Sequence, residues 1–399
     1  MPKRVTGRYE RTTVGGEEVA AFVPSALPPG GPPIVIDAGL AERLRVAEQA
    51  LLRLELAGAM VPSLDWFIYA FVRKEAVLSS QIEGTQATLV DLLTFEAQQG
   101  AEQSAAPNDD VEEVCNYLDA LAYARAEVID PSGLPLSMRL LNETHRRLMR
   151  GARGAEKLPG EVRSSQNWIG GSRPGNAAYV PPPPHALGEV LGAFERYLHS
   201  DYSLPALVRA GLLHVQFETI HPYLDGNGRI GRLLVTLLLE HWKLLTQPLL
   251  YLSLFFKRHR EDYYRRLNAV RAQGDWEGWL DFFLDGVATI ADEAVGSARE
   301  LFALVTADRE RVLAHEGMSL VALRLFELLP RHPVVTVAAA MRLLETTKPT
   351  AGRAIDLLVA AGVLVETTGK KRDRSFVYGS YLDRLRAGTE LDGARALRR

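Results

Sequence analysis

Apolar residues recur at helical spacing along most of the chain. Between residues 39 and 59 this stripe consists of Leu40, Leu44, Ala47, Leu51 and Leu54. Comparable stripes run through residues 63–84, 111–126, 138–149, 204–220 and 262–296. A stripe with this period predicts an amphipathic helix that buries one face. The sequence therefore predicts a mainly α fold.

Two segments depart from the helical pattern. Residues 164–184, SSQNWIGGSRPGNAAYVPPPP, contain two short β-prone runs around Gly and Pro residues, which predicts one β-hairpin. The Pro-rich stretch near residue 30 predicts an irregular N-terminal arm over residues 1–35.

The C-terminal part of the chain has its own pattern. Residues 319–329, 334–345 and 348–364 read as three helices, with Gly362 as the stop of the third. Two β-prone runs joined by a basic turn follow, and Lys and Arg outnumber Asp and Glu from Met318 to Arg399. Three helices and a basic two-stranded wing predict a winged-helix domain over residues 317–388. A DNA duplex would then meet Lys348, Thr350 and Arg353 of the third helix and Lys370, Lys371 and Arg372 of the wing. The alternative is a winged helix that serves protein contacts or homodimerisation.

Composition narrows the class of protein. The chain has 399 residues, of which 47% are hydrophobic and 24% charged, as in ordinary globular proteins of two or three domains. No segment is apolar enough to span a bilayer, and no apolar stretch follows the basic N-terminus. The single cysteine, Cys115, cannot form an internal disulfide. We therefore expect a cytoplasmic protein.

The strongest chemical signal is HPYLDGNGRIGR, residues 221–232. Apolar residues follow at helical spacing from Ile230 onward, so a helix should begin near residues 226–229. A helix N-terminus has unpaired N–H groups and partial positive charge, and Gly226 and Gly228 let a ligand approach the backbone. Arg229 and Arg232 add cations on one face. This combination predicts a site for a polyphosphate.

The remaining polar residues of the motif suggest roles in phosphoryl chemistry. Asp225 offers a hard oxygen ligand to Mg²⁺, and His221 could accept a proton from an attacking hydroxyl. Asn227 could donate a hydrogen bond to a phosphate oxygen. Each residue alone could equally be ordinary turn chemistry.

Two familiar phosphate-binding motifs can be rejected. The glycines satisfy G-x-G-x-x-G, but no strand precedes them, which argues against a dinucleotide-binding fold. The P-loop pattern G-x-x-x-x-G-K-[ST] is absent from the sequence.

The motif resembles that of the Fic family, H-P-F-x-[DE]-G-N-G-R-x-x-R, at every position except Tyr223. Most Fic proteins transfer AMP from ATP to a hydroxyl group of a target protein, so the resemblance implies ATP, Mg²⁺ and a protein target. It implies His221 as the base, Asp225 as the metal ligand, and residues 226–228 as the anion hole. Arg229 and Arg232 would bind phosphates. Gln216, Tyr263 and Tyr264 resemble nucleotide-pocket positions, although tyrosines at helical positions more often belong to the core.

A second stretch resembles the family's inhibitory pattern [ST]-x-x-x-E-[GN]. It is SSQIEG, residues 79–84, with Ser79, Glu83 and Gly84 at the fixed positions. A carboxylate paired with Arg232 would occupy the cation that the ATP γ-phosphate needs. The resemblance thus implies an enzyme inhibited by its own Glu83.

The resemblance also assigns a docking element and a domain order. Ala178, Tyr179, Val180 and Pro181 correspond to the family's flap, which would pair main chain to main chain with the target. We expect a helical region with the inhibitory helix over residues 36–115 and the Fic core over 116–300.

Several alternatives stay open at this point. The chain could transfer another nucleotide, remove AMP, or act as a DNA-binding regulator whose Fic core senses nucleotide. The target and the oligomeric state are not encoded in any motif.

Overall fold

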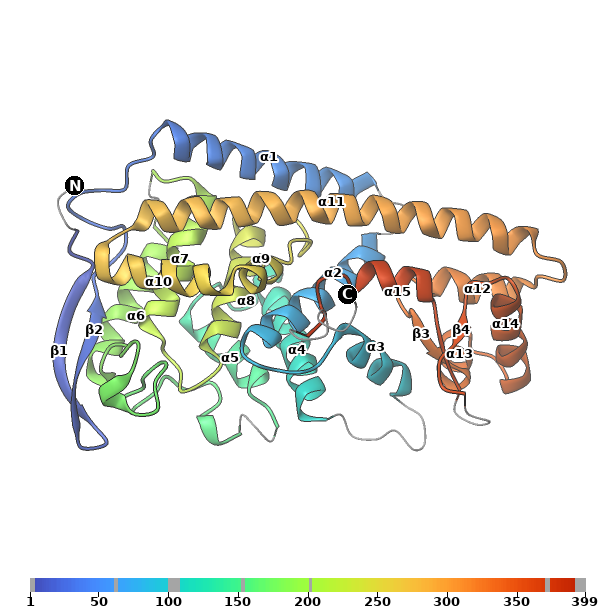
Figure 1. The fold of residues 1–399 in the computed structure, drawn as a ribbon, viewed down its shortest axis with the longest axis horizontal. Coiled ribbons are helices and arrows are strands. Elements are labelled where there is room, and N and C mark those ends of the chain that lie inside the picture. The colour runs from blue at the N-terminus through green and yellow to red at the C-terminus, as the bar shows by residue number, and fades with distance from the viewer. Residues whose placement is uncertain are drawn as a thin grey trace.

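A computed structural model describes residues 4–60, 64–99, 108–151, 155–200, 203–369 and 374–391. The protein is mainly α, as predicted (Figure 1). Within the described parts of the chain, no helix is both long and apolar enough to cross a membrane.

Two long helices run side by side along one face of the molecule (Figure 1). They are α1 (Ala38–Met60) and α11 (Trp276–Ala314). Ion pairs join them, including those of Arg43 with Asp281 and Asp285. Helix α11 continues beyond residue 300, the predicted end of the core, and so links the core to the C-terminal part.

The core helices pack beneath this pair. In chain order they are α2 (Leu64–Ile82), α3 (Leu89–Gln98), α4 (Asp109–Ile129), α5 (Met138–Leu148), α6 (Pro184–Leu198), α7 (Ala206–Ile220), α8 (Asn227–His241), α9 (Ser253–Arg258) and α10 (Arg260–Gln273). Short 3₁₀ turns lie at Ala155–Lys157 and Pro174–Asn176. The predicted boundary at residue 115 falls inside α4, and buried residues on both sides of it share one hydrophobic cluster.

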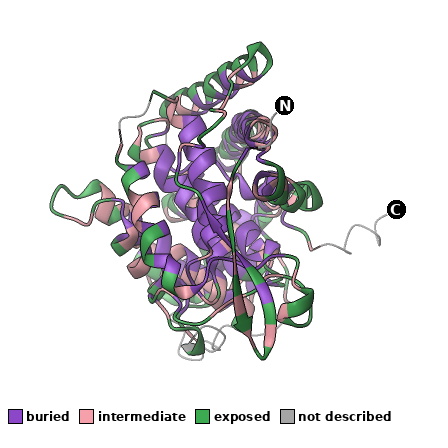
Figure 2. Ribbon diagram, turned by 90° about the vertical axis from the view of Figure 1, so that its left-hand side faces the viewer, coloured by how far each residue is buried: buried purple, intermediate pink, exposed green. Residues whose placement is uncertain are grey.

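Helices α7 and α8 form the centre of this core. Residues Leu207 to Ile220 are all buried, and buried positions dominate the interior in Figure 2. A helix that is buried all round has no solvent-facing polar side, so its polar residues, such as His214 and Gln216, need partners inside the protein. The two helices pack against each other and enclose the connecting loop 221–226.

The N-terminal prediction was wrong. Residues 7–24 form an antiparallel hairpin of β1 (Gly7–Val14) and β2 (Glu17–Pro24), with Gly7 opposite Pro24 and Val14 opposite Glu17. The buried side chain of Arg4 anchors its start through a double hydrogen bond to Glu277. Residues 4–35 are therefore part of the folded body.

The C-terminal part contains α12 (Leu320–Leu328), β3 (Val334–Thr336), α13 (Val337–Leu344), α14 (Lys348–Ala360), β4 (Val365–Glu366), β5 (Ser375–Val377) and α15 (Gly379–Leu385). The strands form an antiparallel sheet of order β3-β5-β4. The expected helix over residues 334–345 thus begins as a strand, because Val334 and Val335 are buried in pairing with β5. The expected wing residues Lys370, Lys371 and Arg372 lie outside the described residues.

Candidate active site

Residues 221–226 of the motif form a tight loop between two buried helices, and residues 227–232 begin α8. His221 caps the end of α7 with φ 52°, and Gly226 caps the start of α8 with φ 75°. These left-handed residues reverse the chain within a few positions. Helix α8 begins at Asn227, which confirms the predicted helix start. The N–H groups of its first turn therefore lie directly beside the loop.

Asn227 has a role in the loop that was not predicted. Its Oδ1 accepts the N–H of Tyr223 at 2.8 Å, and its Nδ2 donates to the carbonyl of Tyr223 at 2.8 Å. The side-chain oxygen and one N–H of the amide are thus used inside the loop, and they hold the loop closed.

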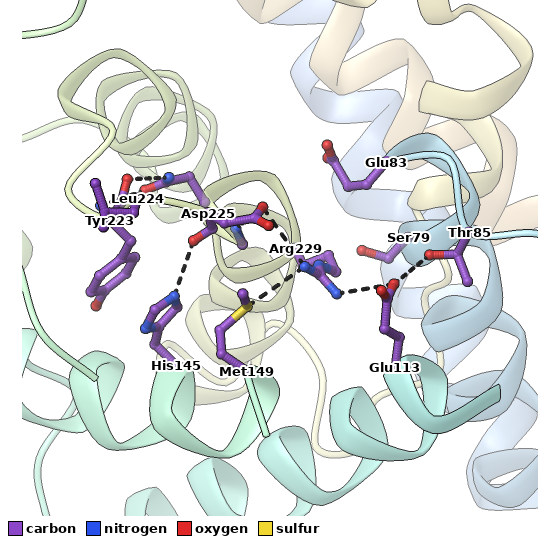
Figure 3. A network of polar contacts seen from close by, with 12 residues as sticks. Ser79, Glu83, Thr85, Glu113, His145, Met149, Tyr223, Leu224, Asp225 and Arg229 are labelled. Atoms are coloured by element: carbon purple, nitrogen blue, oxygen red, sulfur yellow. Dashed lines mark hydrogen bonds and ion pairs between the residues drawn. The ribbon is translucent and has the colours of Figure 1, made fainter. Parts of the chain in front are cut away.

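His145 is a positioning residue that the sequence analysis missed. Its Nδ1 accepts the Gly160 N–H at 2.9 Å, so Nε2 carries the proton and donates to the Asp225 carbonyl at 3.0 Å (Figure 3). Its ring also stacks on Tyr223, with centroids 3.8 Å apart. Burial lowers the pKa of His145 to about 4, so the ring is neutral at pH 7. It supports the motif loop from α5.

His221 is held by its backbone. Its carbonyl accepts a hydrogen bond from Arg163 Nε at 3.0 Å, and Arg163 also bonds to Pro182. Burial, helped by the charge of Arg163, lowers the pKa of His221 to about 4. The imidazole is therefore neutral at pH 7, as a proton acceptor must be.

Arg232 is paired with the predicted inhibitory residues. Its Nη2 lies 2.6 Å from Glu83 Oε1, and Ser79 accepts from Nε at 2.9 Å and from Nη2 at 3.0 Å through its hydroxyl and carbonyl. Burial opposes ionisation of Glu83, but Arg232 outweighs it and lowers the pKa of the carboxyl. Glu83 is thus a carboxylate at neutral pH.

That carboxylate sits at the amino end of α8. A Cβ added to Gly228 would come within 2.2 Å of Glu83 Oε1, so Gly228 makes room for it. Gly84, with φ 100°, turns the chain away directly after Glu83. The structure therefore brings a negative group to the helix end where an anion was expected.

Arg229 has a carboxylate partner of its own. Its Nη1 lies 3.4 Å from Glu113 Oε2 on α4, and the same oxygen accepts the Thr85 hydroxyl at 2.7 Å (Figure 3). The Arg229 side chain is 6% exposed. Glu113 was not singled out from the sequence, since its contact with Arg229 spans 116 residues.

Asp225 is the exposed member of the motif. Its side chain is 51% exposed, and Oδ1 accepts the N–H of Gly226 at 2.6 Å. A single protein carboxylate is enough to bind Mg²⁺, because the ion usually takes its other ligands from water and from the phosphates of the substrate. No group of three or more His, Cys, Asp or Glu within the described residues could hold a metal ion alone.

The expected flap hairpin is reduced to one bridge. Ile169 and Tyr179 exchange two backbone hydrogen bonds, of 2.8 and 3.1 Å. The Tyr179 hydroxyl donates to the Thr219 carbonyl at 2.6 Å, close to His221 in sequence. Pro181 accepts a bond from Gln166. The flap thus contacts the end of α7.

The other edge of the flap is covered by β2. Phe22 donates its N–H to the Val180 carbonyl at 2.9 Å, and Glu17 accepts the N–H of Gly175 at 2.8 Å. Val19, Ala21 and Val180 form a small buried cluster. Residues 175–180, including the exposed Ala178, therefore lie between Ile169 on one side and the N-terminal hairpin on the other.

Two of the expected nucleotide-pocket residues are used elsewhere. Gln216 is buried and donates to the Ser25 carbonyl at 2.9 Å, so it anchors the N-terminal hairpin. His214 Nδ1 bonds to the Gly231 carbonyl, so its Nε2 accepts the Tyr263 hydroxyl at 2.9 Å. Tyr263 is a core residue, whereas Tyr264 is 41% exposed and available to a ligand.

Two family profiles match the chain. The Fic/DOC family N-terminal profile matches residues 41–126, and the Fic/DOC family profile matches residues 135–239. Protein adenylyltransferase Fic of Drosophila willistoni is 31% identical over 179 residues, 44% of this chain and 32% of that protein. The protein of the same name from Culex quinquefasciatus is 30% identical over 195 residues, 48% of this chain and 36% of that protein. The chain thus spans about a third of the length of these curated relatives.

Solved structures show the same fold. A Fic family protein from Desulfovibrio desulfuricans matches with a TM-score of 0.56 at 20% identity, covering 87% of this chain and 98% of that one. Fic-1 from C. elegans matches with a TM-score of 0.50 at 19% identity, covering 65% of this chain and 73% of that one. With the motif intact on a Fic-type helical core, the chain carries the N-terminal domain and the catalytic-type domain of the Fic/DOC family.

Proposed function

We propose that this protein transfers AMP from ATP to the hydroxyl group of a target protein, itself included. The observation that carries the proposal is the convergence at the start of α8. A neutral His221, an exposed Asp225 and the two arginines of the motif meet the open N–H groups of a helix there. The relatives named as adenylyltransferases support the same donor.

The proposed step is an in-line displacement at the α-phosphorus. The hydroxyl oxygen of the target forms the new bond to phosphorus as the bond to pyrophosphate breaks, and His221 accepts the hydroxyl proton. The helix N-terminus and Arg229 stabilise charge on the phosphate oxygens. Asp225 would hold Mg²⁺, which when bound neutralises charge on the phosphates. Positioning and charge stabilisation supply most of the catalysis.

Glu83 inhibits this step in the proposed mechanism. It neutralises Arg232 at 2.6 Å and lies against Gly228, where it repels a γ-phosphate. ATP is thereby kept from the pose in which the α-phosphorus faces His221. The enzyme is expected to be active once the Glu83 carboxylate has moved away from Arg232.

The target is proposed to pair with the flap. Strand β2 already borders residues 175–180. A target segment that adds a strand to the flap must therefore either pair with residues 167–170 or displace β2. Asn167 supports the first route, since its Nδ2 donates to the Leu224 carbonyl of the motif loop at 3.1 Å.

Mass spectrometry tests this function. The Glu83→Gly variant is incubated with ATP, Mg²⁺ and a protein lysate, and peptides are searched for an added AMP on Ser, Thr or Tyr. Addition of a nucleotide other than AMP would show that the donor is not ATP. Loss of AMP from a pre-labelled protein would show that the enzyme removes AMP. If no peptide gains or loses a nucleotide, the transferase proposal is wrong and a nucleotide-sensing role is favoured.

For the C-terminal part we propose a winged helix that meets DNA through α14. The order of its elements supports this, as does the exposure of Lys348 and Arg353 beside the half-buried Thr350. Thr350 and Arg353 also border an open cavity of about 550 Å³ that is shared with Val321 of α12. In a gel-shift titration, Arg353→Ala should weaken duplex binding and Glu300→Ala should not. Equal affinity of both variants would favour a protein-contact role.

A further inference from the structure

The end of the described chain folds back onto the inhibitory helix. After α15 ends at Leu385, residues 386–391 reach the last turn of α2 and the side of α9. Thr389 is 1% exposed, and a Cβ added to Gly388 would come within 2.8 Å of Leu254 on α9. This segment is therefore packed into the core.

Gln81 is the residue on α2 that receives it. Its Nε2 donates to the Thr389 carbonyl at 2.9 Å and to the Ala87 carbonyl at 2.9 Å. Its Oε1 accepts from Lys257 Nζ at 2.7 Å, and Lys257 also donates to the Glu390 carbonyl at 2.6 Å. Gln81 thus connects the C-terminal segment, α9 and the chain beyond α2.

Gln81 stands two residues before Glu83, in the turn that ends the helix. That turn is closed by backbone bonds from Glu83 and Thr85 to the Ser80 carbonyl and from Gly84 to the Gln81 carbonyl. On its far side, Thr85 donates to Glu113. The inhibitory carboxylate therefore lies between two fixed points, and one of them is supplied by the C-terminal segment.

We propose that Gln81 is a positioning residue for Glu83, and that residues 386–391 hold it in place. The C-terminal part of the chain then determines how stable the ion pair between Glu83 and Arg232 is. Any partner that pulls residues 386–391 away releases one end of the turn and raises transferase activity. This inference rests on the proposed function for its effect on activity, and on the contacts alone for its effect on the turn.

Two perturbations test it against matched controls. A chain ending at residue 385 lacks the segment, and a chain ending at residue 391 keeps it. Gln81→Ala removes the bond to Thr389 within the full chain, together with the bonds of Gln81 to Ala87 and Lys257. Because each perturbation removes hydrogen bonds that hold the turn, the shorter chain and Gln81→Ala should raise autolabelling by about three- to tenfold. The chain ending at 391 should match the full chain, and neither perturbation should add to Glu83→Gly.

Hydrogen exchange provides the readout that does not depend on catalysis. Amides of residues 83–85 should exchange several-fold faster in Gln81→Ala and in the shorter chain, while amides of α7 keep their rates. Unchanged exchange at residues 83–85 overturns the proposal, whatever the activity. An equal rise of activity in the Glu83→Gly background also overturns it. A Glu83→Gly variant that transfers nothing, with faster exchange still present, instead refutes the proposed function.

Discussion

Replacing Glu83 by Gly should convert an inhibited enzyme into an active one. The variant removes the partner of Arg232 at 2.6 Å and the carboxylate that lies against Gly228. Two charges in contact at an effective dielectric constant of about 20 have a Coulomb energy on the order of 4 kcal/mol. Because the Glu83 side chain is 36% exposed, solvent screening reduces the effect to about 2 to 3 kcal/mol. That corresponds to a roughly 30- to 140-fold higher rate.

The assay is pyrophosphate release with saturating ATP and Mg²⁺, followed for the full chain and the variant in parallel. Glu83→Gln is the matched control: it keeps the shape and loses the charge, so its rate should fall between the two. Glu300→Gln, at an exposed site on α11, should change nothing. If Glu83→Gly releases pyrophosphate no faster than the full chain while both bind ATP, Glu83 does not inhibit the enzyme.

Three further outcomes are expected. In the Glu83→Gly background, Asp225→Asn should raise the Mg²⁺ concentration for half-maximal rate at least severalfold, because one carboxylate ligand is lost; an unchanged Mg²⁺ titration would remove Asp225 from that role. Asn227→Ala should lower the free energy of unfolding by about 2 kcal/mol in urea titrations, since two hydrogen bonds to Tyr223 are lost. Burial lowers the pKa of His214 to about 4. The neutral ring therefore stabilises the folded chain fully above about pH 6.5, and this stabilisation is lost as the pH falls towards 4. The stability advantage of the full chain over His214→Gln should therefore shrink on acidification, and an advantage that stays constant would contradict the assigned pKa.

Features set by neighbouring residues were predictable from the sequence. The start of α8 follows from the glycines and the apolar stripe beginning at Ile230, and both lie within the same dozen residues. The contact of Glu83 with Arg232 was expected only because the two patterns resemble a family. Spacing alone could not have predicted it, since the contact spans 149 residues.

Features that depend on distant partners were not predictable. Gln216 has a side chain suited to a ligand, but one N–H of its amide donates to the Ser25 carbonyl, 191 residues away in the chain. The hairpin of β1 and β2 was missed because β1 is largely exposed and lacks a regular apolar alternation. Its stability comes from contacts such as that of Phe22 with Val180, which join segments far apart in the chain.

Transfer of label from ATP tests whether His221 promotes attack on the α-phosphate. Glu83→Gly is incubated with ATP labelled at the α-phosphate or at the γ-phosphate, beside a variant that also carries His221→Ala. We expect protein labelling from the α-position only, and loss of that labelling with His221→Ala at an unchanged melting temperature. Labelling from the γ-position, or α-labelling that persists without His221, would contradict this expectation.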